Sequence, residues 1–297
     1  MEHDALVIGG GFAGLAAATY LARARRKVCV VDNRLPRNRF AKASHGFLGQ
    51  DGSNPLAILA EAREQLSVYP TAALLQDEAV SARKDRDGFT VSMASGQTLK
   101  ADKLILAFGL RDELPPIPGL RERWGQSVLH CPYCHGIEFS DRRLGVLYRT
   151  EMSVHQALIV AEWGPVTLYL DGARLEPDAA RKLAERGIAV VDGPVSALEG
   201  DGPALSAIRL ESGERIAIDA LYLAPRPCLS SPLAEQLGVD VEEGAMGPVI
   251  RTDADKLTSV PGVYAAGDIA RAPHSVSWAV ADGVTAGTSA HRAMVFG

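Results

Sequence analysis

Two cysteines three positions apart, Cys131 and Cys134, have the spacing of a redox-active pair. Thiols at this spacing can form a disulfide and be reduced again. Pro132 favours the first position of a helix, because it has no N–H group to leave unpaired there. Cys131 would then lie at a helix N-terminus, where the helix dipole and neighbouring imidazoles lower a thiol pKa from about 8.5 to roughly 3.5–7.5. The segment therefore predicts a cysteine pair that cycles between thiols and a disulfide.

The same residues match two other kinds of site. With His135, the pair forms the CxxCH string that attaches haem covalently, but such attachment belongs to exported proteins and the sequence shows no export signal. A zinc site would need a second pair of ligands. Cys29 and Cys228 lie in or beside apolar strand-like segments, where they are expected to be small core residues. We therefore expect neither haem nor a bound metal.

The composition bounds the class of protein. With 297 residues, 47% of them hydrophobic and 23% charged, the chain has the size of two globular domains. Its formal net charge of -5 disfavours nucleic acid as a partner. No apolar stretch approaches the length of a membrane span. Strand-like sequence begins at Ala5 and leaves no room for a signal peptide, so we expect a cytoplasmic protein without membrane association.

The N-terminal segment has the pattern of a dinucleotide site. An apolar strand at residues 5–8 leads into residues 9–14 (GGGFAG), which fit G-x-G-x-x-G, and then into a helix at residues 15–24. A second strand at residues 27–31 ends in Asp32. The glycines allow a tight turn and close approach of a pyrophosphate to the helix N-terminus, and the acid suits a ribose hydroxyl.

The far end of the chain indicates which dinucleotide binds. Residues 262–268 (GVYAAGD) read as a short strand that ends in a Gly-Asp turn, followed by a helix from about Val276. An acid there can bind a ribityl chain beside a flavin ring. Between the two ends, an apolar strand at residues 104–109 stops at a glycine, and a proline-rich link at residues 114–119 suits a crossing between domains.

Over nearly its whole length the chain resembles the low-molecular-weight thioredoxin reductase family. The resemblance is carried, in the family's order, by residues 9–14, Gly109 with residues 117–119, Cys131 with Cys134, and residues 266–268. It implies an α/β fold of two Rossmann-like, three-layer nucleotide-binding domains and a homodimer. The FAD domain would be discontinuous, at residues 1–114 and 242–297. The inserted NAD(P)H-like domain, at residues 115–241, would carry the cysteine pair.

The resemblance also implies roles for particular residues. FAD would contact Gly9, Gly11, Phe12, Ala13, Gly14, Asp32, Arg39, His45, Gly109, Gly267, Asp268, Ser275 and Val276. Cys134 would face the flavin, and Cys131 would exchange disulfides with the substrate. Other interpretations remain open at two places in the segment from Arg34 to Gly52: Arg37 and Arg39 also suit a solvated basic loop, and His45 also suits a structural imidazole.

The inserted domain departs from the family at the turn that would bind NADPH. After an apolar strand at residues 144–147, residues 148–153 (YRTEMS) contain no glycine, so side chains stand where bare backbone must approach a pyrophosphate. Glu151 would repel each phosphate charge by about 3 kcal/mol at about 5 Å and an effective dielectric of about 20. Arg174 is the single candidate for a 2′-phosphate contact. We expect a domain that keeps its α/β fold without binding NADPH.

The cysteine motif departs from thioredoxin reductases as well, because His135 follows the second cysteine where they have an acid. The string CPYCHG is similar to that of the FAD-dependent dithiol oxidases of the gliotoxin and holomycin type. This similarity implies a thiol–disulfide oxidoreductase that uses FAD to oxidise a small dithiol to a disulfide and passes the electrons to molecular oxygen. His135, or His130, is the candidate acid or base for the thiol protons.

Three other functions remain open. The first is a thioredoxin reductase-like enzyme that receives electrons from ferredoxin or from NAD(P)H and acts on a thioredoxin-like protein. The second is a redox sensor that binds FAD and cycles its cysteines without multiple turnover. The third is a scaffold in which the cysteines only pack. The residues do not specify the physiological thiol.

Overall fold

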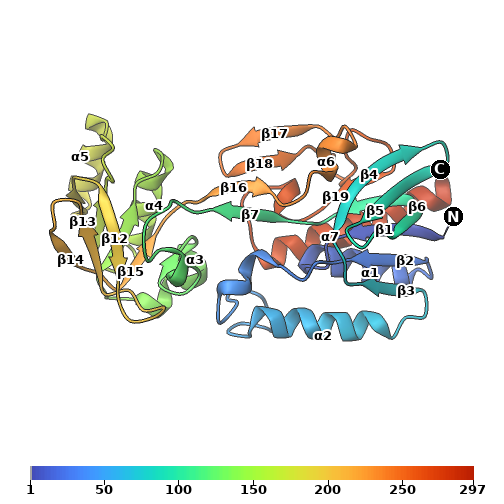
Figure 1. Ribbon diagram of the computed structural model, residues 1–297, viewed down its shortest axis with the longest axis horizontal. Helices are drawn as coiled ribbons and strands as arrows, with labels where there is room; N and C mark the ends of the chain where they lie inside the picture. The colour runs from blue at the N-terminus through green and yellow to red at the C-terminus, as the bar shows by residue number, and fades with distance from the viewer. Residues whose placement is uncertain (1) are drawn as a thin grey trace.

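The computed structural model describes residues 2–297, in which two α/β units lie at opposite ends of an elongated molecule (Figure 1). The larger unit contains a sheet of β1 (His3–Ile8), β2 (Val28–Val31), β3 (Ala72–Leu75), β4 (Ala79–Asp85), β5 (Gly88–Met93), β6 (Thr98–Leu106) and β19 (Val263–Ala265). Its helices are α1 (Phe12–Arg23), α2 (Pro55–Ser67) and α7 (Val276–Phe296). Helix α1 begins three residues earlier than expected, directly after the glycine turn.

Strand register brings the expected dinucleotide residues to one edge of this sheet. Ile8 pairs in parallel with Val31 of β2 and with Leu106 of β6, and Leu106 pairs with Ala265 of β19. The residues that follow these four strand ends therefore emerge side by side at the carboxyl edge, where α/β sheets bind their ligands. These residues are Gly9 and its turn, Asp32, residues 107–109 and residues 266–268.

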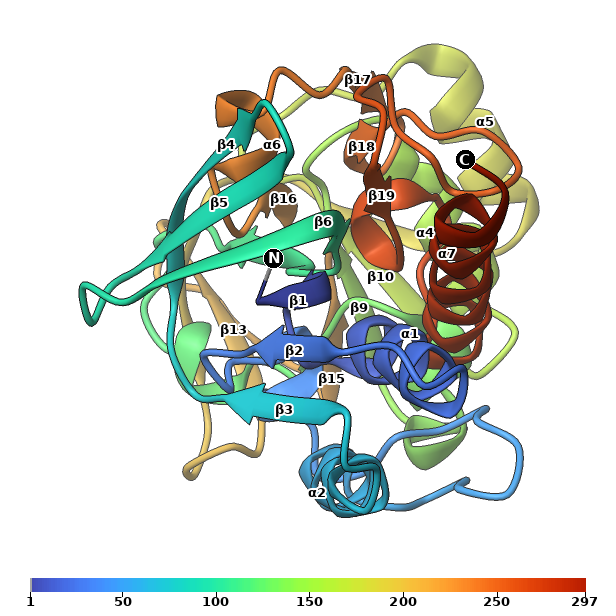
Figure 2. The same cartoon turned by 90° about the vertical axis from the view of Figure 1, so that its right-hand side faces the viewer.

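Helices α1 and α7 lie side by side on one face of the sheet (Figure 2). Glycines in α7 permit the contact: a Cβ added to Gly283 would lie 2.1 Å from the carbonyl oxygen of Ala13, and one added to Gly287 would lie 2.6 Å from that of Ala17. Because no larger side chain fits, the small residues of α7 fix the position of α1 and of the turn at its N-terminus.

The smaller unit contains an all-parallel sheet in the order β11-β10-β9-β15-β8. Its strands are β8 (Val128–Leu129), β9 (Leu144–Leu147), β10 (Val166–Tyr169), β11 (Ala189–Val191) and β15 (Ala220–Tyr222), with helices α4 (Met152–Val160) and α5 (Pro177–Glu185). An antiparallel sheet of β12 (Val195–Glu199), β13 (Ala207–Leu210) and β14 (Arg215–Ala217) packs beside it. The one-turn helix α3 (Pro132–His135) follows β8.

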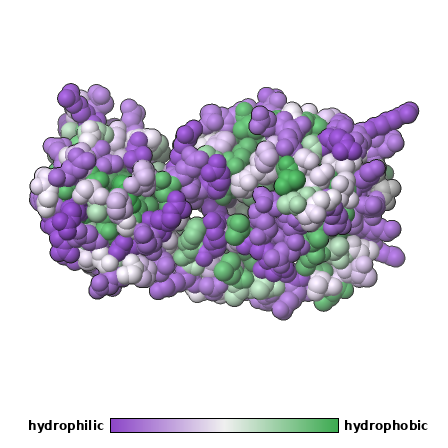
Figure 3. Space-filling model, viewed as in Figure 1, coloured by the Kyte–Doolittle hydropathy of each residue, from purple (hydrophilic) through white to green (hydrophobic). Residues whose placement is uncertain are grey.

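A two-stranded antiparallel ribbon of β7 (Leu110–Glu113) and β16 (Arg226–Leu229) connects the units, and the surface is hollowed between them (Figure 3). After the ribbon come α6 (Leu233–Gln236), β17 (Val241–Gly244) and β18 (Gly247–Ile250). Leu233, Ala234 and Val239 belong to the core of the larger sheet, although they precede the expected boundary at residue 242. We therefore propose that the chain returns to the first domain at β16.

The two Rossmann-like units, each with a parallel sheet and helices, confirm the predicted fold class. Each unit also has its own buried core, made of separate clusters of aliphatic side chains. The apolar strand expected at residues 144–147 is present as β9 with the same bounds. The antiparallel sheet β12–β14 and the connecting ribbon had not been predicted from the sequence.

Candidate active site

A cavity of about 340 Å³ opens at the carboxyl edge of the larger sheet and extends to the cysteine pair of the smaller unit. Of the residues expected to act in catalysis or cofactor binding, the cavity is lined by Gly9, Gly11, Phe12, Ala13, Asp32, His45, Gly109, Cys131, Cys134, His135, Gly267, Asp268, Ser275 and Val276. The structure thus brings together residues from five separate segments of the chain. The volume of the cavity lies in the range of small-molecule and cofactor sites.

Gly14 and Arg39 do not line the cavity. Gly14 lies where a Cβ would approach the carbonyl oxygen of Gly9 to 1.8 Å, so its place in the motif is explained by close packing of the turn on the helix. Arg39 donates through Nη1 to the carbonyl of Pro36 at 2.9 Å, and its guanidinium stacks over Phe40. Its side chain therefore belongs to the loop surface, as the alternative interpretation of this residue expected.

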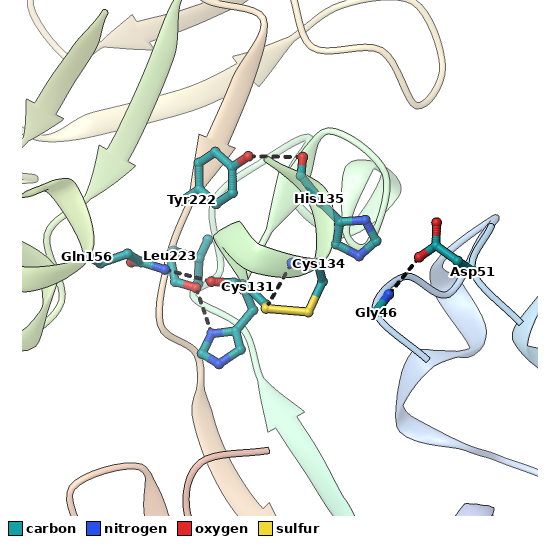
Figure 4. Close-up of a disulfide and its surroundings, with 9 residues drawn as sticks. Gly46, Asp51, Cys131, Cys134, His135, Gln156, Tyr222 and Leu223 are labelled. Carbon is teal, nitrogen blue, oxygen red and sulfur yellow. Dashed lines mark hydrogen bonds between the residues drawn. A yellow bond between two sulfur atoms is a disulfide. The ribbon is translucent and has the colours of Figure 1, made fainter. Parts of the chain in front are cut away.

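Cys131 and Cys134 form a disulfide with their Cα atoms 5.3 Å apart (Figure 4). Pro132 is the first residue of α3, and Cys131 is its N-cap, with Sγ accepting from the backbone N–H of Cys134 at 3.2 Å. The local geometry expected from the sequence is thus present. The Tyr222 hydroxyl donates to the carbonyl of His135 at 3.2 Å, which ties the end of α3 to the neighbouring strand β15.

His130 is held as a neutral imidazole with a defined tautomer. Its Nδ1 lies 3.3 Å from the carbonyl oxygen of Leu223 and must carry the proton, because a carbonyl only accepts. Burial, assisted by the positive charge of Arg37, lowers the pKa of His130. The lone pair is therefore on Nε2. The side-chain amide of Gln156 donates to the backbone carbonyl of His130 at 2.7 Å and fixes the chain at this point.

His135 lies at the opposite end of α3 and also lines the cavity. Burial lowers the pKa of His135, so it is neutral and able to accept a proton near pH 7. The imidazole of His45 stands edge-on to it, with ring centroids 6.2 Å apart. Nε2 of His45 lies 3.0 Å from Oε1 of Glu138, so this nitrogen is engaged by a carboxylate.

A half-buried charged cluster near His130 was not predicted from the sequence. Arg37 donates to both carboxylate oxygens of Asp112, at 2.6 and 2.9 Å, and through Nη1 to Asp268 at 3.1 Å. Nη1 also lies 2.9 Å from Nδ1 of His274, which must accept because arginine only donates. Four separate segments meet here, so no local pattern could reveal the cluster. The solvated loop face considered for Arg37 is wrong.

The charged groups of this cluster shift each other's pKa values. Burial acts to lower the pKa of Arg37, but hydrogen bonds and charge from Asp112 and Asp268 outweigh it and raise the pKa. Burial lowers the pKa of His274, and the positive charge of Arg37 acts in the same direction. Arg37 therefore ties the loop after β2 to the connecting strand β7 and to the Gly-Asp turn after β19.

The larger unit fits an FAD molecule. No side chain caps the N-terminus of α1, so its free N–H groups can bind phosphate. A Cβ added to Gly11 would meet nothing within 4 Å, which leaves the backbone open to a ligand. Oδ2 of Asp32 is buried and has no hydrogen-bond partner among residues 2–297. A ribose hydroxyl would satisfy it.

The corresponding turn of the smaller unit is already satisfied by the protein. The hydroxyl of Ser153, which is fully buried, accepts from the backbone N–H groups of Arg149 at 2.9 Å and Thr150 at 3.4 Å. Asp171, at the end of the next strand, accepts from the N–H of Val195 at 2.9 Å and pairs with Arg149 at 3.4 Å. The groups that would contact a second dinucleotide are thus used within the fold.

Two further observations concern the part of the chain that the structure describes. No helix in residues 2–297 is long and apolar enough to cross a membrane. Within the same residues, no group of three or more His, Cys, Asp or Glu side chains is arranged to hold a metal ion. Cys29 is buried in the larger core, where burial raises its pKa to about 11, and Cys228 lies half-buried on β16.

Comparison with known proteins agrees with this geometry. A family model described as pyridine nucleotide-disulphide oxidoreductase matches residues 3–283. Thioredoxin reductase sirT of Leptosphaeria maculans is 33% identical over 96% of this chain and 92% of its own, and thioredoxin reductase tcpT of Claviceps purpurea is 36% identical over 97% and 92%. A crystal structure of an oxidoreductase from Agrobacterium tumefaciens is 42% identical, covers 100% of this chain and 99% of its own, and superposes with a TM-score of 0.94. The chain therefore belongs to the pyridine nucleotide-disulphide oxidoreductase family, whose members bind FAD, and is a thioredoxin reductase-like oxidoreductase.

Proposed function

We propose that the protein is an FAD-dependent dithiol oxidase that does not use NADPH. The observation that carries the proposal is the position of the Cys131–Cys134 disulfide, which lines the same cavity as the turn after β1, Asp32 and Asp268. A disulfide there can exchange electrons with a flavin bound to those residues and exchange thiols with a substrate. Bound FAD would supply the two-electron oxidation that restores the disulfide, with molecular oxygen as the final acceptor.

In the thiol–disulfide exchange, Cys131, Cys134 and His135 would each have a separate role. A thiolate of the substrate attacks Sγ of Cys131, the bond to Cys134 breaks, and its electron pair remains on the Cys134 sulfur. The second substrate thiol then displaces Cys131, which releases the substrate as a disulfide and leaves both cysteines reduced. His135 would accept the proton of an entering thiol, since burial favours its neutral form.

Independence from NADPH is supported by the smaller unit. Backbone N–H groups that would have to bind a pyrophosphate already donate to Ser153, and Asp171 is engaged by Arg149 and Val195. Binding a dinucleotide there would require these bonds to break, and each buried donor or acceptor left unpaired costs about 1–3 kcal/mol. Glu151, at the start of α4, adds charge repulsion.

The test is an anaerobic titration of the purified flavoprotein, followed through the visible absorbance of the flavin. We expect a small dithiol to reduce the flavin, and NADPH or NADH in equal amount to leave it oxidised. Admission of air should restore the spectrum and yield one hydrogen peroxide per dithiol consumed. Rapid reduction by NADPH would overturn the proposal in favour of a reductase that acts on thioredoxin-like proteins.

The same titration separates the remaining candidates. Stoichiometric reduction by dithiol without repeated turnover in air would indicate a redox sensor. Reduction by reduced ferredoxin, with no response to dithiol, would indicate an electron-fed reductase. A Cys131→Ser, Cys134→Ser double variant is the matched control, because it keeps the flavin site and removes the exchanging pair; its flavin should not respond to dithiol.

A further inference from the structure

The loop that follows η1 (Arg37–Phe40) is a compact unit held closed by its own hydrogen bonds. The side chain of Asn54 donates to the carbonyl of Lys42 at 3.1 Å, and the backbone N–H of Ser44 donates to the carbonyl of Ser53 at 2.8 Å. Within the loop, the N–H of Gly46 donates to the carboxylate of Asp51 at 2.8 Å. These bonds close the ends of the loop on each other, so residues 42–54 form a single element that we name the strap.

The strap lies next to the redox motif of the other unit, with Gly46 and Asp51 facing His135 (Figure 4). His45 is the residue that makes the contact. Its Nε2 lies 3.0 Å from Oε1 of Glu138, in the short helix η3 (Ile137–Phe139), and its Nδ1 lies 3.6 Å from Oδ1 of Asp51. The imidazole is thus held between a carboxylate of its own loop and a carboxylate just beyond the cysteine motif.

This contact crosses between the FAD-side unit and the unit that carries the disulfide. The side chain of His45 is 22% exposed and that of Glu138 is 37% exposed, so the pair is only partly screened by water. His45 and Glu138 both adjoin His135: the two rings meet edge to face at 88°, and Glu138 follows His135 by three residues. The His135 ring therefore has an imidazole, that of His45, and a carboxylate, that of Glu138, as its neighbours.

We propose that His45 and Glu138 are positioning residues, which hold the imidazole of His135 in place at the cavity from both units and adjust its readiness to accept a thiol proton. The role given to His135 rests on the proposed function, whereas the arrangement of the three side chains does not. His45 would therefore act on the reaction through His135, with each of its ring nitrogens near a carboxylate oxygen.

The charges around His135 predict the direction in which each substitution should shift its pKa. Burial is the largest effect and lowers the pKa of His135; the carboxylate of Glu138 raises it, and His45 lowers it. Asp51 contacts His45 at 3.6 Å, and the charges that act on the pKa of His135 are those of Glu138 and His45. The Tyr222 hydroxyl contacts the backbone carbonyl of His135 and not its imidazole. Removal of Glu138 and of His45 should therefore move the pKa of His135 in opposite directions.

The experiment is an NMR titration of the oxidised holoenzyme labelled in its histidine rings, with the His135 signal assigned from a His135→Gln variant. We expect Glu138→Gln to lower the pKa of His135 and His45→Gln to raise it. Each shift should reach at least about half a unit, the effect of one charge at about 6 Å in a water-like dielectric. Asp87→Asn, which removes an exposed carboxylate in the turn between β4 and β5, is the control and should leave the pKa of His135 unchanged.

Two results would overturn the inference. If Glu138→Gln and His45→Gln both raise the pKa toward its ordinary value, the substitutions only open the site to water. If neither moves it, the pair does not act on His135. The pH profile of dithiol turnover tests the proposed function separately: opposite shifts in the titration without matching shifts in the profile would keep the positioning pair and reject His135 as the acting base.

Discussion

At the scale of single residues, the two cysteines of the disulfide occupy unequal positions. Cys131 precedes α3 and accepts the N–H of Cys134 at its sulfur, whereas Cys134 lies within the helical turn. A thiolate on Cys131 would keep this hydrogen bond and the favourable end of the local dipoles. The geometry therefore suits Cys131 for the role of the cysteine that forms and breaks the mixed disulfide with the substrate.

This asymmetry leads to a trapping prediction. In a Cys134→Ser variant, a substrate thiol that has joined Cys131 cannot be displaced by the second cysteine, so we expect a mixed disulfide on Cys131 when an oxidised substrate is supplied. In Cys131→Ser the same treatment should leave the protein unmodified. Intact-mass spectrometry measures the added mass. Equal modification of both variants would mean that the two thiols are interchangeable.

The glycines of the first turn differ in a way that a motif does not express. A Cβ on Gly14 would lie 1.8 Å from the carbonyl oxygen of Gly9, while a Cβ on Gly11 would meet no atom within 4 Å and would enter the cavity. One glycine is required for the fold to close, and the other leaves space for the ligand.

Substitution by alanine should separate these requirements. We expect Gly14→Ala to cost more than about 3 kcal/mol in the free energy of unfolding, because backbone must move to admit the methyl group. Gly11→Ala should cost about 1 kcal/mol or less, since its backbone is in an extended conformation that alanine adopts. Chemical denaturation measures both. Flavin release on dialysis should be faster for Gly11→Ala than for the unmodified protein; tight retention would place the phosphates elsewhere.

At the scale of elements, the sequence predicts those parts of the site that are formed by residues close together in the chain. The turn before α1, the cap of α3 by Cys131 and the loss of glycine before α4 are each contained within about ten residues. Strand register then places them, because residues after parallel strand ends share one edge of the sheet. A local pattern plus one rule of topology is enough for these features.

Clusters made by several elements could not be predicted in this way. Arg37, Asp112, Asp268 and His274 come from a loop, the connecting ribbon and two positions near the C-terminus, and each residue alone is an ordinary charged or polar side chain. The same is true of His45 and Glu138. Their partners are set by how two units meet, which no periodicity or spacing in the sequence records.

At the scale of the whole molecule, three half-buried histidines meet at the cavity between the units. His130 comes from the end of β8, His135 from α3 and His274 from the segment before α7, and all three line it. Burial is the largest cause of the lowered pKa at each of them. Protonation of these rings therefore destabilises the folded state relative to the unfolded chain.

The consequence is a defined sensitivity to acid. In the unfolded chain each of these histidines has its ordinary pKa near 6.5, whereas in the folded protein the pKa is lower. Below about pH 6.5 the unfolded state therefore binds more protons, and protonation favours unfolding. We expect the free energy of unfolding, measured by urea denaturation, to be steady from pH 8 to 7. It should then fall as the pH drops below about 6.5, until the folded-state pKa values are reached.

The loss of stability at low pH should depend on the histidines of the cavity and not on those of the surface. His135→Gln removes one group that must stay neutral, so its stability should decline less steeply than that of the unmodified protein between pH 6.5 and 5.5. His155→Gln is the matched control, because His155 is exposed on α4, and its decline should equal that of the unmodified protein. If all three proteins decline in parallel, the acid sensitivity arises from groups other than His135, and the prediction is wrong.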